Sequence, residues 1–343
     1  MVGSDLSQFR QFAGGSRFRL RVNAGVFHHS QRERKVNVNC RLWRGFWQLA
    51  DPKIWVASTV PMLVGAALAY GNTGNFSLYW FVVSLIGVYC IEIAKNATNE
   101  VADYAAGIDQ AIPVDKRTPF SGGKKTIVDG LLTVAEAKVI AVATLAAGIL
   151  IGLYIVVFRE PSVFWVGLIG VFFATFYSLP PFRFNYTGWG EFVVGMTFGP
   201  AITAGIYLVM THTLTSEAIL TGVPIGFLIA NVLWINQYPD YEADAHGGKH
   251  NWVVRLGRQR AVVVYRFLFL CASVSLVALA WVYRNPVWLL GLAAVPLEEQ
   301  AVQIAKRHYD DIPNLIPANA KTIVIYQLTG LLMLIAALSN RFI

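Results

Sequence analysis

Long apolar runs separated by short polar segments dominate the chain from about residue 54 onward. A helix that spans a bilayer needs about 20 mostly apolar residues. By this criterion the pattern predicts nine spanning helices, at about residues 54–71, 78–100, 136–158, 162–179, 190–210, 216–238, 262–283, 286–305 and 321–339. The eighth of these runs is interrupted by Pro296, Glu298, Glu299 and Gln300. The pattern therefore predicts an all-α, polytopic membrane protein.

The composition supports this class. Hydrophobic residues make up 55% of the 343 residues, charged residues 14%, and the mean hydropathy is +0.50. Soluble domains contain about 25% charged residues, so a soluble fold is disfavoured. The formal net charge of +8 comes from cations in loops between apolar spans, which is typical of membrane orientation and not of nucleic-acid binding. The three cysteines form no CxxC pattern and predict neither a disulfide framework nor a zinc site.

Lysine and arginine lie unevenly between the two sides of the predicted bundle. They are concentrated before the first span and in the loops that follow even-numbered spans. The opposite side carries only Arg159, Arg284 and Arg341. The positive-inside rule then places the N-terminus and the even-numbered loops in the cytoplasm and the C-terminus outside. We expect an integral, multi-pass protein of a cell inner membrane or an organelle membrane.

Residues 1–45 differ from the rest, being rich in Arg and Phe and poor in acids. Two interpretations stay open: a basic, partly disordered tail that contacts anionic lipid, or an organelle transit peptide. Residues 46–343 are expected to form a single transmembrane domain.

Two polar clusters follow even-numbered spans on the predicted cytoplasmic side. In "NATNEVADY" (96–104), Asn99 and Asp103 are four apart and share one helix face, which Asn96 extends. Asp109 follows Gly107, where we expect this helix to have ended. In "NQYPDYEAD" (236–244), Asn236, Asp240 and Asp244 are spaced by four. We expect them to lie on an extension of the sixth span and to project to one side, with a kink at Pro239.

Carboxylate and amide oxygens are hard ligands that suit Mg²⁺, which is typically held by one or two carboxylates plus substrate phosphates. One acidic cluster at a helix end is often only an interface feature. Two matching clusters on the same side instead predict a two-sided clamp for a diphosphate. Nearby cations are candidate diphosphate ligands, although the positive-inside rule also explains cations there: Lys53, Arg117, Lys124, Arg183 and Lys249. "GGKKT" (122–126) lacks the first glycine of a P-loop and follows no strand, so we do not interpret it as one.

These motifs resemble those of UbiA-type intramembrane prenyltransferases, and the resemblance covers nearly the whole chain after about residue 43. "NEVADYAAGID" (99–109) is similar to the first aspartate-rich motif, "NQYPDYEAD" to the second, and "YSLPPFR" (177–183) follows the fourth span as in the family. Within the family, these motifs look most like those of the dihydroxynaphthoate prenyltransferases of menaquinone and phylloquinone synthesis. The hydroxybenzoate branch usually has N-D-x-x-D-x-x-x-D, where this chain has Glu100 and Gly107 in place of two aspartates.

The resemblance implies helices around a central cavity that opens to lipid, capped by helices in the cytoplasmic loops. It implies Mg²⁺, with two ions expected, bound by the first-motif residues Asn99, Asp103 and Asp109 and by the second-motif residues Asn236, Asp240 and Asp244. Asp103 and Asp240 would be the catalytic carboxylates that promote ionisation of an allylic diphosphate. An aromatic acceptor would then attack the prenyl cation, which nearby aromatic side chains would shield: Tyr104, Phe173, Tyr177 and Tyr238.

The metal motifs do not distinguish the acceptor. Related enzymes prenylate homogentisate, 4-hydroxybenzoate, haem or glycerol phosphate, or cyclise the prenyl chain without an acceptor. A secondary transporter with intramembrane acids is a remote alternative, because its sites usually lie at the membrane midplane and these clusters lie at helix ends. The expected partners are a polyprenyl diphosphate, an aromatic acceptor and membrane lipid, with no nucleic acid.

Overall fold

A computed structural model of the chain describes residues 39–112, 117–120 and 123–342. Residues from Leu42 onward form one compact unit of the chain. The predicted tail 1–45 lies mostly outside the described residues, so both interpretations of it stay predictions. The unit that begins at Leu42 contains the predicted transmembrane domain.

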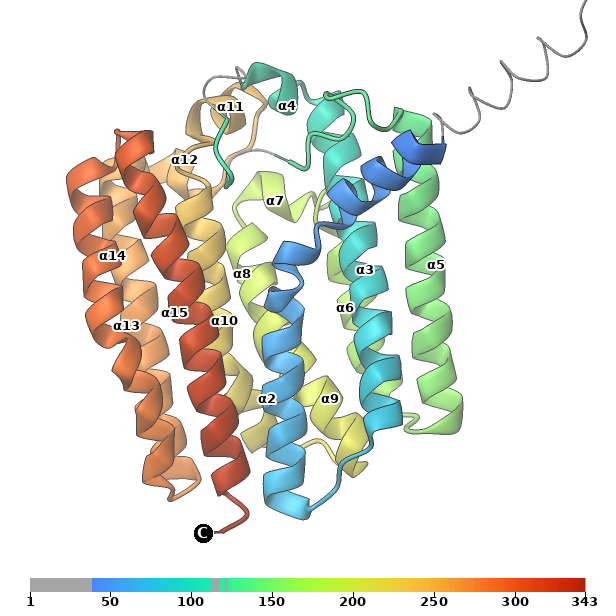
Figure 1. Ribbon diagram of the computed structural model, residues 1–343, viewed down its shortest axis with the longest axis vertical. Coiled ribbons are helices and arrows are strands. Elements are labelled where there is room, and N and C mark those ends of the chain that lie inside the picture. The colour runs from blue at the N-terminus through green and yellow to red at the C-terminus, as the bar shows by residue number, and fades with distance from the viewer. Residues whose placement is uncertain (1–38, 113–116, 121–122, 343) are drawn as a thin grey trace, which may run out of the picture. The chain divides into compact units, whose positions relative to one another are not determined.

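The described residues of this unit form helices and no strand (Figure 1). The long continuous helices are α2 (Val56–Thr73), α3 (Leu78–Ala105), α5 (Val134–Phe158), α6 (Val163–Phe176), α10 (Ser216–Asn236), α13 (Arg258–Val282) and α15 (Ile312–Ser339). Two further helices are each built from consecutive elements: α8 (Gly190–Met196), η3 (Thr197–Ala201) and α9 (Ile202–Thr211) form one, and η4 (Pro286–Ala294) and α14 (Val295–His308) form the other. The short elements are η1 (Pro52–Ile54), α4 (Ile108–Ala111), α7 (Phe184–Thr187), α11 (Tyr241–His246) and α12 (Trp252–Leu256).

Every predicted span falls on a helical element in the predicted order, but the count of nine is not confirmed. In the described chain, six helices are long and apolar enough to cross a membrane. A seventh is reached if α2 is joined to the helical segment before it, from which it is bent by 48°. The predicted fourth span, α6, is a shorter apolar helix of 14 residues, and the eighth contains the polar α14 with Glu298 in its first turn.

Side-chain caps fix where several long helices begin. Ser77 accepts the backbone N–H of Trp80 before α3, and Thr215 accepts that of Ala218 before α10. Thr133 starts α5 with a complete capping box. These short polar residues satisfy N–H groups that a helix end otherwise leaves unpaired.

Small residues bring η3 and α10 into backbone contact. A Cβ atom on Gly199 would lie 2.5 Å from the carbonyl oxygen of Gly222, and one on Gly222 would lie 2.5 Å from Cα of Pro200. Gly222 and Gly226 are spaced as in the small-xxx-small pattern of membrane helix pairs. Larger side chains at these positions would push the two helices apart.

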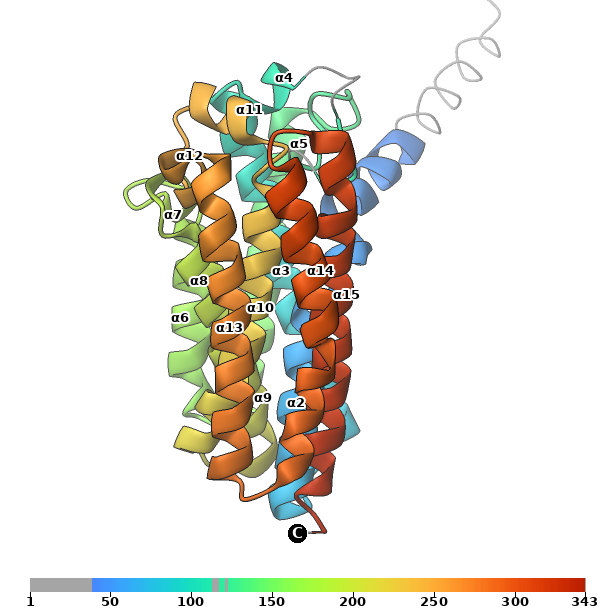
Figure 2. The ribbon, with the colours of Figure 1, turned by 90° about the vertical axis from the view of Figure 1, so that its left-hand side faces the viewer.

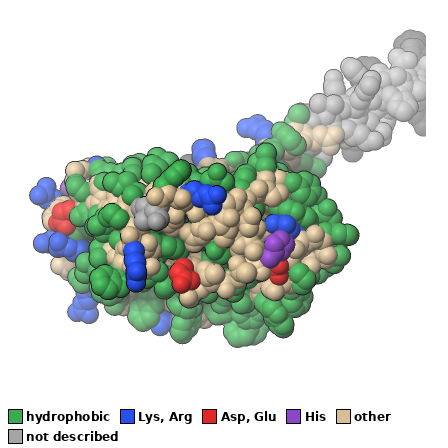
Figure 3. All heavy atoms as spheres, turned by 90° about the horizontal axis from the view of Figure 1, so that it is seen from below, with side chains coloured by type: hydrophobic (Ala, Val, Ile, Leu, Met, Phe, Trp, Pro, Cys, Tyr) green, Lys and Arg blue, Asp and Glu red, His purple; other side chains and the backbone are tan. Residues whose placement is uncertain are grey.

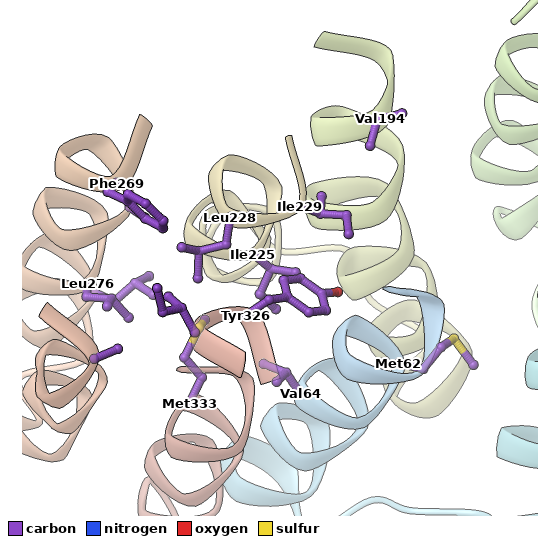
Figure 4. Packing of buried hydrophobic residues seen from close by; sticks show 14 of the residues in the cluster. Met62, Val64, Val194, Ile225, Leu228, Ile229, Phe269, Leu276, Tyr326 and Met333 are labelled. Carbon is purple, nitrogen blue, oxygen red and sulfur yellow. The ribbon is translucent and has the colours of Figure 1, made fainter. Parts of the chain in front are cut away.

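The core lies between α2, α10, α13 and α15 (Figure 4). Met62, Ile225, Phe269 and Met333 are among its buried side chains. Large apolar side chains also cover the outside of the bundle: Val142, Val157, Trp165, Val263 and Trp281. Water would oppose such exposure, whereas lipid tails would match it, so the outer surface agrees with a membrane location.

The two ends of the bundle differ. The short helices α4, α7, α11 and α12 gather at one end (Figures 1 and 2). The opposite end shows scattered charged side chains among apolar and uncharged atoms (Figure 3). The predicted orientation would put the end with the short helices in the cytoplasm, and this sidedness stays a prediction.

Candidate active site

The first polar motif lies at the end of α3 as its spacing predicts. Asn99 Nδ2 donates to Asp103 Oδ2 at 2.8 Å, so the two side chains share one face. The helix ends at Ala105, and Gly107 takes the left-handed conformation with φ 76° before α4 begins. This turn carries Asp109 onto α4, where its side chain is fully buried.

The second motif does not continue α10 as a kinked helix. α10 ends at Asn236 and α11 begins at Tyr241, so Pro239 lies in a break because it lacks an N–H and cannot continue the helix. Asn236 Oδ1 accepts from Asn319 Nδ2 of α15 at 2.9 Å, whereas Asp244 faces Lys249. The expectation that the motif residues all project to one side is therefore wrong.

Lys249 joins the two motifs. Its Nζ lies 2.8 Å from Asp103 Oδ2 and 3.5 Å from Asp244 Oδ1, and only 7% of the residue is exposed. Asn251 donates to the other oxygen of Asp244 at 2.8 Å. Burial alone would lower the pKa of Lys249, but the carboxylates of Asp103 and Asp244 raise it well above its usual value. A charged ammonium therefore lies between carboxylates that are 141 positions apart in the sequence.

The segment after α6 supplies donors that sequence analysis missed. Ser178 Oγ and Asn185 Nδ2 donate to Asn99 Oδ1 at 2.8 and 3.0 Å. Tyr186 donates its hydroxyl to Asp103 Oδ1 at 2.7 Å. Burial and the charge of Asp103 raise the pKa of Tyr186, which keeps its hydroxyl protonated. These residues follow no regular spacing that would have revealed them.

Arg183, a predicted diphosphate ligand, lies beside this network. Its guanidinium is 3.9 Å from the ring centroid of Tyr186. The hydroxyl of that ring bonds Asp103, so Arg183 borders the first motif through the aromatic ring. Its position agrees with the predicted role, which stays a prediction.

Glu100 holds a loop. Its two carboxylate oxygens accept from the backbone N–H groups of Lys125 and Ile127, each at 3.1 Å, and from the hydroxyl of Thr126 at 2.9 Å. A Cβ atom on Gly123 would lie 2.9 Å from Glu100 Oε2, so only glycine fits this close approach. The described part of "GGKKT" thus surrounds a carboxylate, and Glu100 acts as a loop anchor.

Asp109 is the carboxylate that fits a missing cation best. Its Oδ1 accepts from the N–H of Gly123 at 3.1 Å, but its buried Oδ2 has no hydrogen-bond partner among the described residues. Burial, followed by the charges of Glu100 and Asp103, raises its pKa to about 7. A buried, unpaired carboxylate oxygen near other acids is costly unless a cation binds it. The donor set of Asn99, Asp103 and Asp109 is suited to Mg²⁺.

The described residues do not form a complete protein cage for a metal ion. Nowhere in the described ranges do three His, Cys, Asp or Glu side chains converge closely enough to hold one alone. Mg²⁺ commonly takes only one or two carboxylates and completes its shell with water and substrate phosphates. The site therefore suits a metal–diphosphate complex better than a resident metal.

Four other predicted residues remain, three cations and one carboxylate. Lys124 pairs with Asp51 at 2.8 Å, and Arg117 pairs with Asp129 at 2.9 Å. Lys53 is exposed on η1 and forms no hydrogen bond or ion pair within the described residues. Asp240 lies directly before α11, where its charge acts on Lys125. Their predicted roles in binding stay predictions.

A cavity of about 340 Å³ lies between α2, α3, α5, α6 and the α8–α9 helix. Its lining is mostly apolar and includes Phe173 and Tyr177, whereas Tyr104 and Tyr238 do not line it. Tyr177 directly precedes Ser178, which bonds Asn99, and Lys95 of the lining lies one turn before Asn99, so the chamber ends near the first motif, whose residues do not line it. A cavity surrounded by helices, as the resemblance implied, is therefore present.

Known proteins resemble this chain in sequence. The model of the UbiA prenyltransferase family matches residues 58–322. The chain is 28% identical over 298 residues to a 1,4-dihydroxy-2-naphthoate octaprenyltransferase of Bacillus subtilis, covering 86% of this chain and 93% of that protein. It is also 28% identical over 297 residues to a 2-carboxy-1,4-naphthoquinone phytyltransferase of Synechocystis, covering 84% of this chain and 92% of that protein.

Solved structures share the fold. A UbiA homolog from Aeropyrum pernix superposes with a TM-score of 0.62 at 14% identity, covering 82% of this chain and 98% of that one. A UbiA homolog from Archaeoglobus fulgidus, solved with GPP and Mg²⁺, gives a TM-score of 0.59 at 18% identity, covering 84% and 99%.

Proposed function

Because the chain belongs to the UbiA prenyltransferase family, we propose that it transfers a polyprenyl group from an allylic diphosphate to 1,4-dihydroxy-2-naphthoate. The observation that carries the proposal is Lys249, which brings Asp103 of one motif and Asp244 of the other into a single polar site. The Bacillus and Synechocystis relatives are named for a naphthoate and a carboxynaphthoquinone acceptor, which supports this acceptor and a place in menaquinone or phylloquinone synthesis.

The polar site would bind the diphosphate of the donor. Asn99, Asp103 and Asp109 would hold Mg²⁺ from one side, and the second-motif residues Asn236, Asp240 and Asp244 would complete a two-ion site. Bound Mg²⁺ would neutralise charge on the leaving diphosphate. Diphosphate oxygens would be contacted by cations of this chain: Lys53, Arg117, Lys124, Arg183 and Lys249.

The reaction would break one carbon–oxygen bond and form one carbon–carbon bond. The allylic C–O bond breaks with its electron pair leaving on diphosphate, and electrons of the acceptor ring form the new bond to the prenyl cation. The carboxylate then leaves the ring as CO₂, and the pair of its broken bond restores the aromatic system. The prenyl diphosphate and dihydroxynaphthoate thus give prenylated dihydroxynaphthalene, diphosphate and CO₂, with atoms and charge balanced.

The chamber would receive the prenyl tail. Its apolar lining excludes water from the cation, and Phe173 and Tyr177 present rings to it. The donor tail and the product both partition into lipid, which explains why the site is built among membrane helices. The acidic acceptor would enter from the cytoplasmic end, where loop cations attract it.

The test is a product assay with the purified full chain in detergent, Mg²⁺ and geranylgeranyl diphosphate. Dihydroxynaphthoate, 4-hydroxybenzoate and homogentisate are supplied separately and products are identified by mass. We expect an adduct that lacks CO₂ from dihydroxynaphthoate alone. An adduct of another acceptor, or diphosphate release without an adduct, would overturn the proposed acceptor.

A further inference from the structure

Lys95 is a cation inside the span α3 that the diphosphate site does not use. It lies one helical turn before Asn99 and lines the chamber. Its ammonium is 5.6 Å from the ring centroid of Tyr177 and 5.9 Å from that of Phe198. Within the described residues its ammonium forms no hydrogen bond or ion pair, and it lies against these two aromatic rings.

The neighbouring acid does not neutralise it by direct contact. Glu92 lies on the preceding turn of α3 and accepts the hydroxyl hydrogen of Ser58. No ion pair joins Glu92 to Lys95 in the described structure. An ionisable group at membrane depth is costly and is usually retained because it binds something. The free ammonium facing the chamber is therefore suited to an anionic group of a ligand.

We propose that Lys95 binds the carboxylate of the aromatic acceptor and thereby selects acidic acceptors over neutral ones; this inference rests on the proposed function. The apolar chamber and the rings of Tyr177 and Phe198 would contact the flat face of the acceptor, while the ammonium pairs with its carboxylate. Lys95 and Asn99 are separated by about 6 Å along the helix axis, so a bound ring would lie beside the diphosphate site.

The diphosphate has other cations closer to the motifs. Lys249 contacts Asp103 directly and Arg183 borders it through Tyr186. Lys95 instead points to the side of α3 that faces the chamber. A carboxylate bound there would also offset a positive charge that would otherwise oppose the prenyl cation. Both observations favour the acceptor over the donor as the partner of Lys95.

The experiment measures equilibrium binding of 1,4-dihydroxy-2-naphthoate and of 1,4-dihydroxynaphthalene, which lacks the carboxylate, to the purified full chain without donor. Lys95→Met is compared with the wild type, with Lys95→Arg, and with Lys138→Met, an exposed lysine of α5 outside the chamber. We expect Lys95→Met to weaken binding of the acid about tenfold or more and to change binding of the neutral compound less than about twofold. Lys95→Arg should restore most of the affinity, and Lys138→Met should have no effect.

Melting temperature and donor binding separate other roles. If Lys95 only balanced Glu92 structurally, Lys95→Met would lower the melting temperature and weaken both compounds alike, which would overturn the proposal. If Lys95 bound diphosphate, Lys95→Met would weaken Mg²⁺-dependent binding of geranylgeranyl diphosphate and leave binding of dihydroxynaphthoate unchanged. That result would also overturn the proposal. This test measures binding and needs no turnover. It therefore decides the role of Lys95 even if the product assay fails to detect the proposed reaction.

Discussion

The polar site at the end of the bundle and the chamber beside it differ in how tightly their side chains are held. In the site, Asn99, Asp103 and Asp244 each have at least one hydrogen-bond partner, and most partners come from distant segments. In the chamber, Gly152, Gly167 and Gly170 line the wall, and an added Cβ at each would meet nothing within 4 Å. The site is closely constrained, whereas the chamber has unfilled space. We therefore expect substitutions in the site to change the rate, and substitutions at glycines of the chamber wall to change which donor is used.

The largest effect should come from Asp103→Ala. This change removes the carboxylate that Asn99, Tyr186 and Lys249 all contact. Loss of a group that stabilises transition-state charge typically costs 10²- to 10³-fold, so we expect kcat/KM to fall by about 10³-fold. Glu242→Gln, an exposed carboxylate on α11, is the control and should retain activity. Full Mg²⁺-dependent activity of Asp103→Ala would refute the assignment.

Lys249→Met should rank second. It leaves two buried carboxylates without their shared cation, which should cost about 3–5 kcal/mol of stability and about 10²-fold in kcat/KM. Because Mg²⁺ can supply the missing charge, millimolar Mg²⁺ should raise the melting temperature of the variant more than that of the wild type. An equal shift in both proteins would mean that Lys249 and the metal do not share the site.

Asp109 should make Mg²⁺ binding depend on pH. Its pKa is raised to about 7, so the carboxyl is protonated below pH 7 and must lose a proton to bind the metal. The apparent affinity for Mg²⁺ should therefore fall as pH drops through 7, by up to about tenfold per unit. Asp109→Asn should weaken binding at pH 8 and flatten this dependence. A variant that keeps the wild-type slope would show that another group titrates.

The smallest effect should follow Gly152→Leu in the chamber wall. The new side chain enters open space on α5 and gains helix propensity, so folding should be unaffected. It should reduce kcat/KM for geranylgeranyl diphosphate relative to geranyl diphosphate by about 3- to 10-fold. Val142→Leu, on the exposed face of α5, should leave this ratio unchanged. An unchanged ratio in Gly152→Leu would place the donor tail elsewhere.

Hydrophobic patterning was enough to predict the long helices and their order, because every apolar run falls on helical structure, although the runs at 190–210 and 286–305 each cover a broken helix. It was weaker where polar residues continue a helix: the second span was expected to end near residue 100, but α3 runs to Ala105. There Asn99 and Asp103 bond each other and distant segments, which offsets the loss of apolar contacts. Patterning also failed at the predicted eighth span, because the polar helix α14 that occupies part of it does not meet the criteria for a membrane-spanning helix.

Local spacing predicted only part of the site. The four-residue interval linked Asn99 to Asp103 correctly, since both lie on one continuous helix. The same interval failed for Asn236 and Asp244, because the chain breaks at Pro239. Tyr186, which bonds Asp103 across 83 positions, and Glu100, which anchors a loop, depend on tertiary contacts that no single-sequence period encodes.

Whether both motifs bind one diphosphate is tested most directly by a double-mutant cycle. Mg²⁺-dependent binding of geranylgeranyl thiodiphosphate, a slowly reacting donor analogue, is measured for the wild type, Asp103→Asn, Asp244→Asn and the double variant. If the two carboxylates act in one site, the double variant should lose little more than either single variant, with a coupling free energy of about 1–3 kcal/mol. Fully additive losses, or unchanged binding in either single variant, would contradict a shared site.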